Sequence, residues 1–199
     1  MAGLPPATLA LLAANIAAFL LQGTAGTAML MNFALWPPGP PGAPPFELWQ
    51  LVTYGFLHGG FLHLAFNMLG LYMFGPDIER LFGSRFFAAY WFASVVAAAL
   101  AHLLFATGGS GPPVPTVGAS GGVFGLLLAF GWYFPHRKVL LLIPPIPLPA
   151  RVFVALYGAV ELYLGVTSSM SGVAHFAHLG GMVGGWLMIE FRRRARLRR

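Results

Sequence analysis

Long apolar segments, spaced along almost the whole chain, constrain this sequence more than any other feature. A bilayer core about 30 Å thick needs roughly 20 apolar residues per crossing helix. Only 8% of the 199 residues are charged and 58% are hydrophobic, against roughly 25% charged in soluble domains. The sequence therefore predicts an all-α, polytopic membrane helix bundle and excludes a soluble globular enzyme. We predict six transmembrane helices, at 8–27, 60–76, 86–106, 117–134, 152–168 and 172–191.

Proline-rich stretches predict where the long connections lie. Residues 37–45 read PPGPPGAPP, and because prolines cannot continue a helix, we expect a long irregular first outer loop there. Residues 135–151 are apolar but broken by prolines, which favours an interfacial connection over a seventh span. We treat residues 1–199 as a single membrane domain with a core at 46–191 and a basic tail at 192–199.

The cationic residues give an independent test of the number of spans. With six spans, all 11 Lys and Arg residues fall in connections on one side or in the basic tail. The positive-inside rule then predicts that both termini are cytoplasmic and that the proline-rich loop lies outside. This pattern suits the plasma membrane of a bacterial cell, with the tail attracting anionic membrane lipids. The formal charge of +6 comes from that tail, which lacks aromatic interleaving, so we expect no nucleic-acid partner. The N-terminus has no basic n-region, so we expect no signal peptide.

The absence of cysteine limits the chemistry that the chain can perform, and the spacing of its glycines predicts which helices pack together. The chain has no Cys, which excludes disulfides, thiolate metal sites and a cysteine nucleophile. Small residues four apart let helices approach closely in lipid. Such pairs occur in the fourth and sixth predicted spans, at Gly121 and Gly125 and at Ala177, Gly181 and Gly185. We therefore expect these two spans to touch.

Polar side chains inside predicted spans are candidates for function, because they are costly in a bilayer unless paired. Four of them share one depth. If the even-numbered spans start outside, a rise of 1.5 Å per residue puts these four side chains roughly 5 to 10 Å below the outer end of their helices. They are Ser120, His63, Asn67 and His178.

This set of groups suits nucleophilic acyl transfer. A serine hydroxyl needs a base that takes its proton and later returns it to the leaving amine. Asn67, His63 and the backbone N–H of Ser120 can donate to the developing oxyanion. Gly118 and Gly121 leave room for a substrate backbone. A lone G-x-S-G is a weak signal, however, and spacing does not choose between His175 and His178 as the base.

Four motifs occur in a consistent order: HGGFLHLAFNM at 58–68, ERLFGS at 79–84, GASGGVFGL at 118–126 and AHLGG at 177–181. Across about residues 49–186, the chain resembles the rhomboid family of intramembrane serine proteases. The resemblance implies that Ser120 is the nucleophile, that His178 is the general base, and that His63 and Asn67 stabilise the oxyanion. The A-H-x-x-G pattern, which includes Gly181, favours His178 over His175. It also implies cleavage of transmembrane protein substrates by a Ser-His dyad without metal or other cofactor.

Several residues remain without a firm role at this stage. We expect His58 to support the site as a hydrogen-bonding residue near the start of the second predicted span. We expect His102 to be packed against neighbouring side chains. Glu161, in the middle of a predicted span, should be protonated or hydrogen-bonded; it could also gate substrate or orient a histidine. No acid is obviously placed to orient the base, and a dyad should be slower than a triad.

Two further points bear on function. Many rhomboid proteins carry Trp-Arg in the first outer loop, whereas this chain has Trp49-Gln50, which puts the rigidity of the loop in doubt. The alternative function is a catalytically inert rhomboid-like protein that binds or escorts membrane helices, although such a protein has no need of all four polar residues. A transporter is disfavoured because those residues cluster away from the bilayer midplane.

Overall fold

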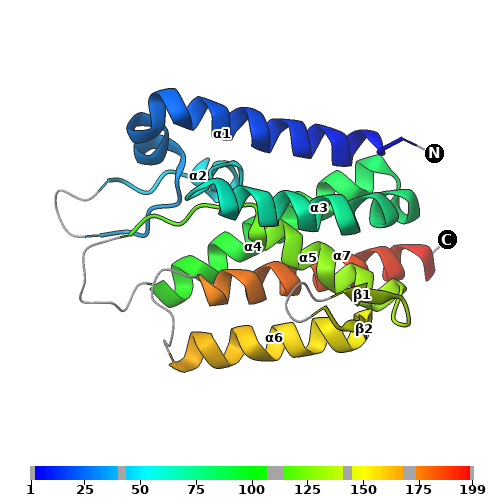
Figure 1. The fold of residues 1–199 in the computed structure, drawn as a ribbon. Coiled ribbons are helices and arrows are strands. Elements are labelled where there is room, and N and C mark those ends of the chain that lie inside the picture. Colours follow the sequence, from blue (N-terminus) through cyan, green and yellow to red (C-terminus); the bar gives the residue numbers. More distant parts are fainter. Residues whose placement is uncertain (1–2, 40–43, 107–113, 141–144, 168–173, 198–199) are drawn as a thin grey trace.

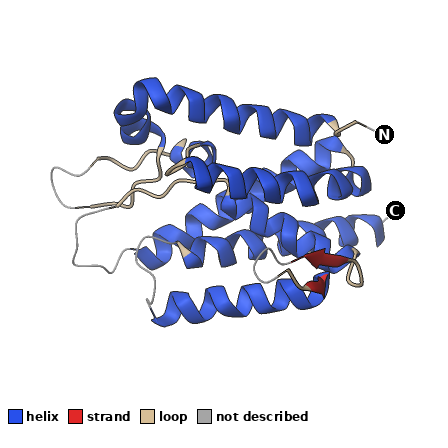
Figure 2. Cartoon of the chain, viewed as in Figure 1, coloured by secondary structure: helices blue, strands red, loops and turns tan. Residues whose placement is uncertain are grey.

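The computed structural model describes residues 3–39, 44–106, 114–140, 145–167 and 174–197, and it is a bundle of helices (Figures 1 and 2). The predicted helix bundle is confirmed. The elements, in chain order, are α1 (Pro6–Phe33), α2 (Gln50–Thr53), the 3-10 turn η1 (Tyr54–Phe56), α3 (Phe61–Phe82), α4 (Ser84–Ala106), α5 (Ser120–Tyr133), β1 (Lys138–Leu140), β2 (Pro147–Pro149), α6 (Ala150–Thr167) and α7 (His175–Leu197).

Helices α4, α5 and α7 pack on one another at the centre of the bundle. Helix α1 packs on α3 at one edge, and α6 packs on α5 and α7 at the opposite edge (Figure 1). The two ends of the chain, the turn between α3 and α4, and strands β1 and β2 all lie at one end of the bundle (Figure 1). The cationic residues of these segments therefore gather at that end.

The outward faces of the bundle are apolar. Leu20 of α1, Leu104 of α4 and Val166 of α6 are 68%, 71% and 69% exposed. Within the described residues, α1, α4 and α6 are long and apolar enough to cross a membrane by length and composition, while α5 is apolar but has 14 residues. An apolar exterior is what lipid requires of a helix bundle. The number of crossings stays a prediction.

Several helix bounds differ from the predicted spans. Helix α1 continues to Phe33 through a kink at Ala25, where φ is −124° and ψ is 28°. Helix α3 contains Pro76 and continues to Phe82, because a neighbouring packed helix can compensate for the backbone bond that proline removes. Parts of the predicted proline-rich loop (40–43) and of the last two spans (168 and 172–173) lie outside the described residues.

The predicted interfacial connection contains two short strands, a small departure from an all-α fold. Lys138–Leu140 pairs antiparallel with Pro147–Pro149, with Val139 opposite Leu148. Prolines are tolerated on such a short ribbon because it consists of edge strands. Arg137 next to the ribbon forms an ion pair with Asp77 of α3, so the connection is fastened to the end of the bundle.

Glycines bring α5 and α7 into contact, as predicted for the fourth and sixth spans. A Cβ atom at Gly181 of α7 would collide with the backbone of Gly121 in α5. A Cβ atom at Gly184 would lie 2.9 Å from the backbone oxygen of Ala93 in α4. The backbones thus meet directly, which brings the start of α5 beside the first turns of α7.

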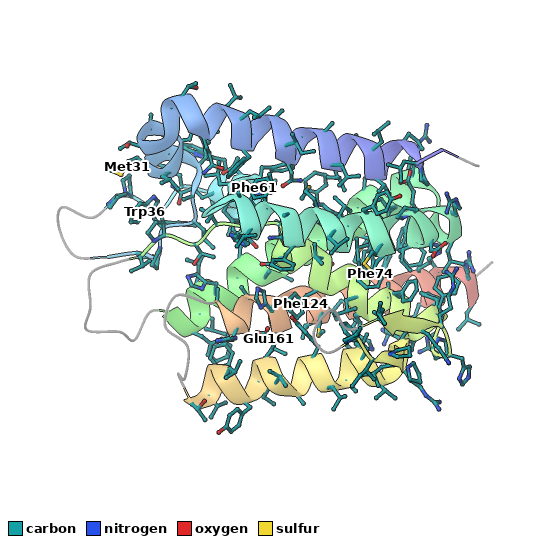
Figure 3. The ribbon with its side chains drawn as sticks, viewed as in Figure 1. Met31, Trp36, Phe61, Phe74, Phe124 and Glu161 are labelled. Carbon is teal, nitrogen blue, oxygen red and sulfur yellow. The ribbon has the colours of Figure 1, made fainter. Side chains whose placement is uncertain are left out.

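The first loop is held by Trp49 and by Gln50, which stands where the Trp-Arg pattern has arginine. Gln50 is 1% exposed; its amide oxygen accepts a hydrogen bond from the backbone N–H of Trp36 at 3.2 Å, and its NH₂ donates to the carbonyl of Pro45 at 3.3 Å. Trp49 donates its indole N–H to the carbonyl of Asn32 at 2.9 Å. The described part of the loop is therefore held in place without an arginine side chain. Trp36 lies where the loop leaves α1 (Figure 3).

Candidate active site

Ser120 and His178 meet at the junction of α5 and α7. The Nε2 atom of His178 lies 3.0 Å from the Oγ atom of Ser120, which is hydrogen-bond distance. The two residues are 58 positions apart in the chain, so the contact depends on the close packing of the two helices. His175 does not reach the serine; its ring points to Glu161.

The imidazole of His178 is held on one face by Phe124. The two rings are stacked, with centroids 4.2 Å apart and planes inclined by 6°. Phe124 follows Ser120 by four residues on α5, so both project from the same face of that helix. Sequence analysis did not assign a role to Phe124, although this i, i+4 spacing was the signal that could have indicated one. Figure 3 shows Phe124 in the interior of the bundle.

His63 and Asn67 line the same space from α3. The Nδ1 atom of His63 accepts the backbone N–H of Gly59 at 3.2 Å, so in neutral His63 the proton is on Nε2, which can donate. Asn67 is buried and donates one amide N–H to the carbonyl of His63 at 2.9 Å, and this bond orients its side chain.

Gly118 permits the close approach of His63 to the serine. Its φ of +129° is unfavourable for residues with a side chain. A Cβ atom there would lie 2.8 Å from Nε2 of His63 and 3.7 Å from Oγ of Ser120. Any side chain at this position would therefore intrude between the two groups.

A cavity of about 1030 Å³ joins these groups. It lies between α3, α5, α6 and α7 and is bordered by the extended segment at 114–117. Such a volume can accommodate several residues of an extended peptide or a ligand of comparable size. Its lining includes His63, Asn67, Ser120, Phe124, Tyr157 and His178.

Glu161 of α6 corrects the expectation that no acid lies near the base. Its Oε2 atom is 2.7 Å from Nδ1 of His175, a hydrogen bond, and 3.0 Å from Nδ1 of His178. The contact with His178 is at ion-pair distance without hydrogen-bond geometry in this structure. Glu161 points into the bundle from α6 (Figure 3). Sequence analysis left orientation of a histidine open as one role of Glu161 and could not identify the histidine, because the partners lie on another helix.

The same three side chains are of the types that bind metals. Among the described residues, Glu161, His175 and His178 bring one possible ligand atom each within 4.8 Å of one another. However, Oε2 of Glu161 lies 2.7 Å from Nδ1 of His175 and 3.0 Å from Nδ1 of His178. These are hydrogen-bond distances, at which a proton rather than a metal ion lies between the atoms.

His58 and His102 lie close to these groups and have different partners. The backbone of His58 exchanges two hydrogen bonds with the amide of Gln22, but neither ring nitrogen of this buried histidine has a hydrogen-bond partner within the described residues. Its ring packs edge-on against His63 at 5.2 Å. His102 contacts the Thr116 hydroxyl through Nε2 at 2.8 Å and lines the cavity.

Comparisons with known proteins agree with the motifs. Residues 45–195 match the model of the rhomboid domain. The chain is 31% identical over 141 residues to the rhomboid protease GluP of Bacillus subtilis, covering 70% of this chain and 25% of that protein. It is 33% identical over 156 residues to rhomboid protein 1, mitochondrial, of Saccharomyces cerevisiae, covering 75% of this chain and 44% of that protein.

A third relative aligns over nearly the whole chain. The rhomboid protease GlpG of Photorhabdus laumondii is 28% identical over 187 residues, covering 92% of this chain and 60% of that protein. The chain thus spans between a quarter and three fifths of the length of these relatives. The domain match covers well over half of the chain and includes the helices that carry the polar cluster. This chain therefore belongs to the rhomboid family.

Proposed function

We propose that this protein is an intramembrane serine endopeptidase that cleaves the transmembrane segments of membrane-protein substrates. The observation that carries the proposal is the 3.0 Å contact between Nε2 of His178 and Oγ of Ser120. It joins a hydroxyl and a base from separate helices at the wall of a large cavity. The names of relatives such as rhomboid protease GluP support the same activity.

The proposed reaction begins with attack of the Ser120 hydroxyl oxygen on the scissile carbonyl carbon. His178 accepts the serine proton at Nε2, and the carbonyl oxygen becomes an oxyanion. When the tetrahedral intermediate collapses, the C–N bond breaks and His178 protonates the departing amine. A water molecule, deprotonated by His178, then hydrolyses the acyl-enzyme and restores the hydroxyl of Ser120.

The oxyanion would be stabilised by donors on the far side of the serine. We assign this role to Nε2–H of His63, the free N–H of the Asn67 amide and the backbone N–H of Ser120. The first N–H groups of a helix have no acceptor within the helix, and Ser120 is the first residue of α5. Each such donor is typically worth about 100- to 1000-fold in kcat.

The membrane arrangement belongs to the same proposal. Six helices, α1 and α3 to α7, would cross the bilayer, in one domain comprising residues 1–199 with its core at 46–191. The cationic end of the bundle, including the basic residues at 192–199, would face the cytoplasm and contact anionic lipids of the plasma membrane. The dyad would then lie toward the outer leaflet.

The test compares the purified protein with Ser120→Ala and His178→Ala in liposomes that contain a single-span substrate. Only the unsubstituted protein should cleave it, with residual activity of the variants lower by at least about 1000-fold. Equal cleavage by all three would refute the roles of the two residues. Binding of the substrate without cleavage by any form would favour the alternative of an inert rhomboid-like protein that holds or escorts membrane helices.

A further inference from the structure

We infer that Glu161 is a positioning residue that completes a Ser-His-Glu arrangement in this protein, which would distinguish it from a dyad enzyme. This inference rests on the proposed function, because it concerns the base of that reaction. Its basis is that the two ring nitrogens of His178 face different partners. Nε2 lies 3.0 Å from Ser120 Oγ, and Nδ1 lies 3.0 Å from Glu161 Oε2.

The carboxylate occupies an unusual position for an acidic side chain. Glu161 lies in the middle of α6, a helix whose other face is apolar and exposed, yet its side chain is turned inward and the residue is 7% exposed. A carboxyl group within a membrane is costly unless it is paired. The partners of Glu161 in the described residues are the two histidines of the first turn of α7. These contacts offset the free-energy cost of placing the carboxyl group inside the bundle.

His175 fixes the carboxylate relative to the base. It donates from Nδ1 to the oxygen that also faces His178, at 2.7 Å. One carboxylate oxygen thereby lies between two imidazoles that are three residues apart on one helix face. Phe124 holds the ring of His178 from the side, so the ring is bounded by the serine, the stacked phenyl group and the carboxylate.

This placement has two consequences for the base. A carboxylate beside Nδ1 favours the tautomer with the proton on Nδ1, which leaves the Nε2 lone pair free to accept the serine proton. It also stabilises the imidazolium that forms during attack. The 3.0 Å separation is within hydrogen-bond distance, and catalytic hydrogen bonds are often poorly aligned until substrate is bound.

A purely structural role for Glu161 predicts different behaviour. If the residue only joined α6 to α7, its loss would lower the thermal stability and weaken substrate binding, but it would not change the protonation of His178. Kinetics and the tautomer of His178 therefore separate the two roles. Glu161→Gln retains the shape of the side chain, and Glu161→Asp retains its charge.

The kinetic test measures kcat and KM for a single-span substrate in liposomes. Glu161→Gln should lower kcat by at least tenfold and by up to about 10⁴-fold, as loss of the carboxylate does in a triad, with KM changed less than about twofold. Glu161→Asp should recover part of the lost kcat. The matched control is Glu190→Gln, the same change at a glutamate that pairs with Arg193 in the last turns of α7, and it should behave like the unsubstituted protein.

The spectroscopic test begins with the unsubstituted protein. The ¹⁵N resonances of His178, identified by their loss in His178→Ala, should show the proton on Nδ1 in the unsubstituted protein. In Glu161→Gln that tautomer should lose its dominance. A proton on Nε2 in the unsubstituted protein, or a Glu161→Gln variant with unchanged kcat, would overturn the inference.

The two proposals fail in distinguishable ways. If the protein cleaves nothing, or if Ser120→Ala cleaves as well as the unsubstituted form, the proposed function is wrong, while the tautomer still decides whether Glu161 positions His178. If Ser120→Ala is inactive but Glu161→Gln retains full kcat, only the role of Glu161 is wrong. If Glu161→Gln does not fold, Glu161→Asp and the tautomer of the unsubstituted protein decide.

Discussion

At the scale of single residues, the site is organised around one imidazole. His178 has the serine at one nitrogen, a carboxylate near the other and a stacked phenyl ring on its face. The prediction of Ser120 as the nucleophile needed all four motifs and their resemblance to a family, because the motif around Gly118 and Ser120 alone is a weak signal. Glu161 could not be placed in the same way, because its approach to His178 depends on how α6 lies against α7.

Phe124 provides a test of ring packing on the base. Replacing it with leucine removes the stacked contact, which is worth about 0.5 to 1.5 kcal/mol, so we expect Phe124→Leu to lower kcat by about 2- to 10-fold. The measurement is the initial rate of substrate cleavage at saturating substrate. Phe105→Leu is the control, because Phe105 stacks on Phe176 with centroids also 4.2 Å apart. An equal loss in both variants would contradict a specific role for Phe124.

At the scale of elements, the contact between α5 and α7 brings the two candidate catalytic groups together. The spacing of small residues was sufficient to predict that these helices touch. The ends of helices and the pairing of β1 with β2 were not predictable in this way, because they depend on tertiary contacts such as that of Arg137 with Asp77. Helix propensity and hydrophobic periodicity describe one segment at a time, whereas these contacts join segments that are far apart in the sequence.

Gly181→Ala tests that contact. The added methyl group would overlap the backbone of Gly121, so the helices must separate, at a cost of about 1 to 3 kcal/mol. A displacement of about 1 Å between the reacting groups can cost about 100-fold in rate. We therefore expect a lower melting temperature and a strong loss of cleavage. Gly158→Ala, where the new methyl group would meet the Met182 sulfur at 3.6 Å, should alter neither; full activity of Gly181→Ala would refute the argument.

At the scale of the whole molecule, Glu79 joins three helices. Its carboxylate accepts hydrogen bonds from the backbone N–H groups of Ala7 and Thr8, from the Thr8 hydroxyl and from Ser84. Glu79 lies in α3 beyond the predicted span at 60–76. Burial acts to raise the pKa of its carboxyl group, but the hydrogen bonds from Ser84, Thr8 and Ala7 outweigh it and hold the pKa below the ordinary value of 4.5.

We expect Glu79→Gln to destabilise the fold by about 1 to 3 kcal/mol, because the buried donors lose a charged acceptor. Since the pKa is lowered in the folded state, this stabilisation is complete above the ordinary pKa and is lost as the pH falls through the folded-state value. Thermal unfolding in detergent, measured from about pH 7 to about pH 3, should therefore show a steeper loss of stability in the unsubstituted protein than in Glu79→Gln. Parallel curves would contradict this role.

The proposed cleavage of transmembrane helices also places a requirement on the substrates. A transmembrane helix has its backbone hydrogen-bonded internally, so it must unwind locally before its carbonyl group can reach Ser120. Glycine destabilises a helix by about 1 kcal/mol relative to alanine, which raises the population of the locally unwound form about fivefold. Substrates with glycine or proline near a small residue at the cleaved bond should be cut faster than polyleucine helices of equal length in a competition assay. Equal rates would refute this requirement for unwinding.

The neutral amide of Gln50 has a consequence for the conditions that the protein tolerates. The amide fastens the first loop through the backbone at Trp36 and Pro45, and neither contact involves an ionised group. Counterions screen attraction between charges, but they leave a pair of amides almost unaffected. Ionic strength should therefore have little effect on this attachment of the first loop.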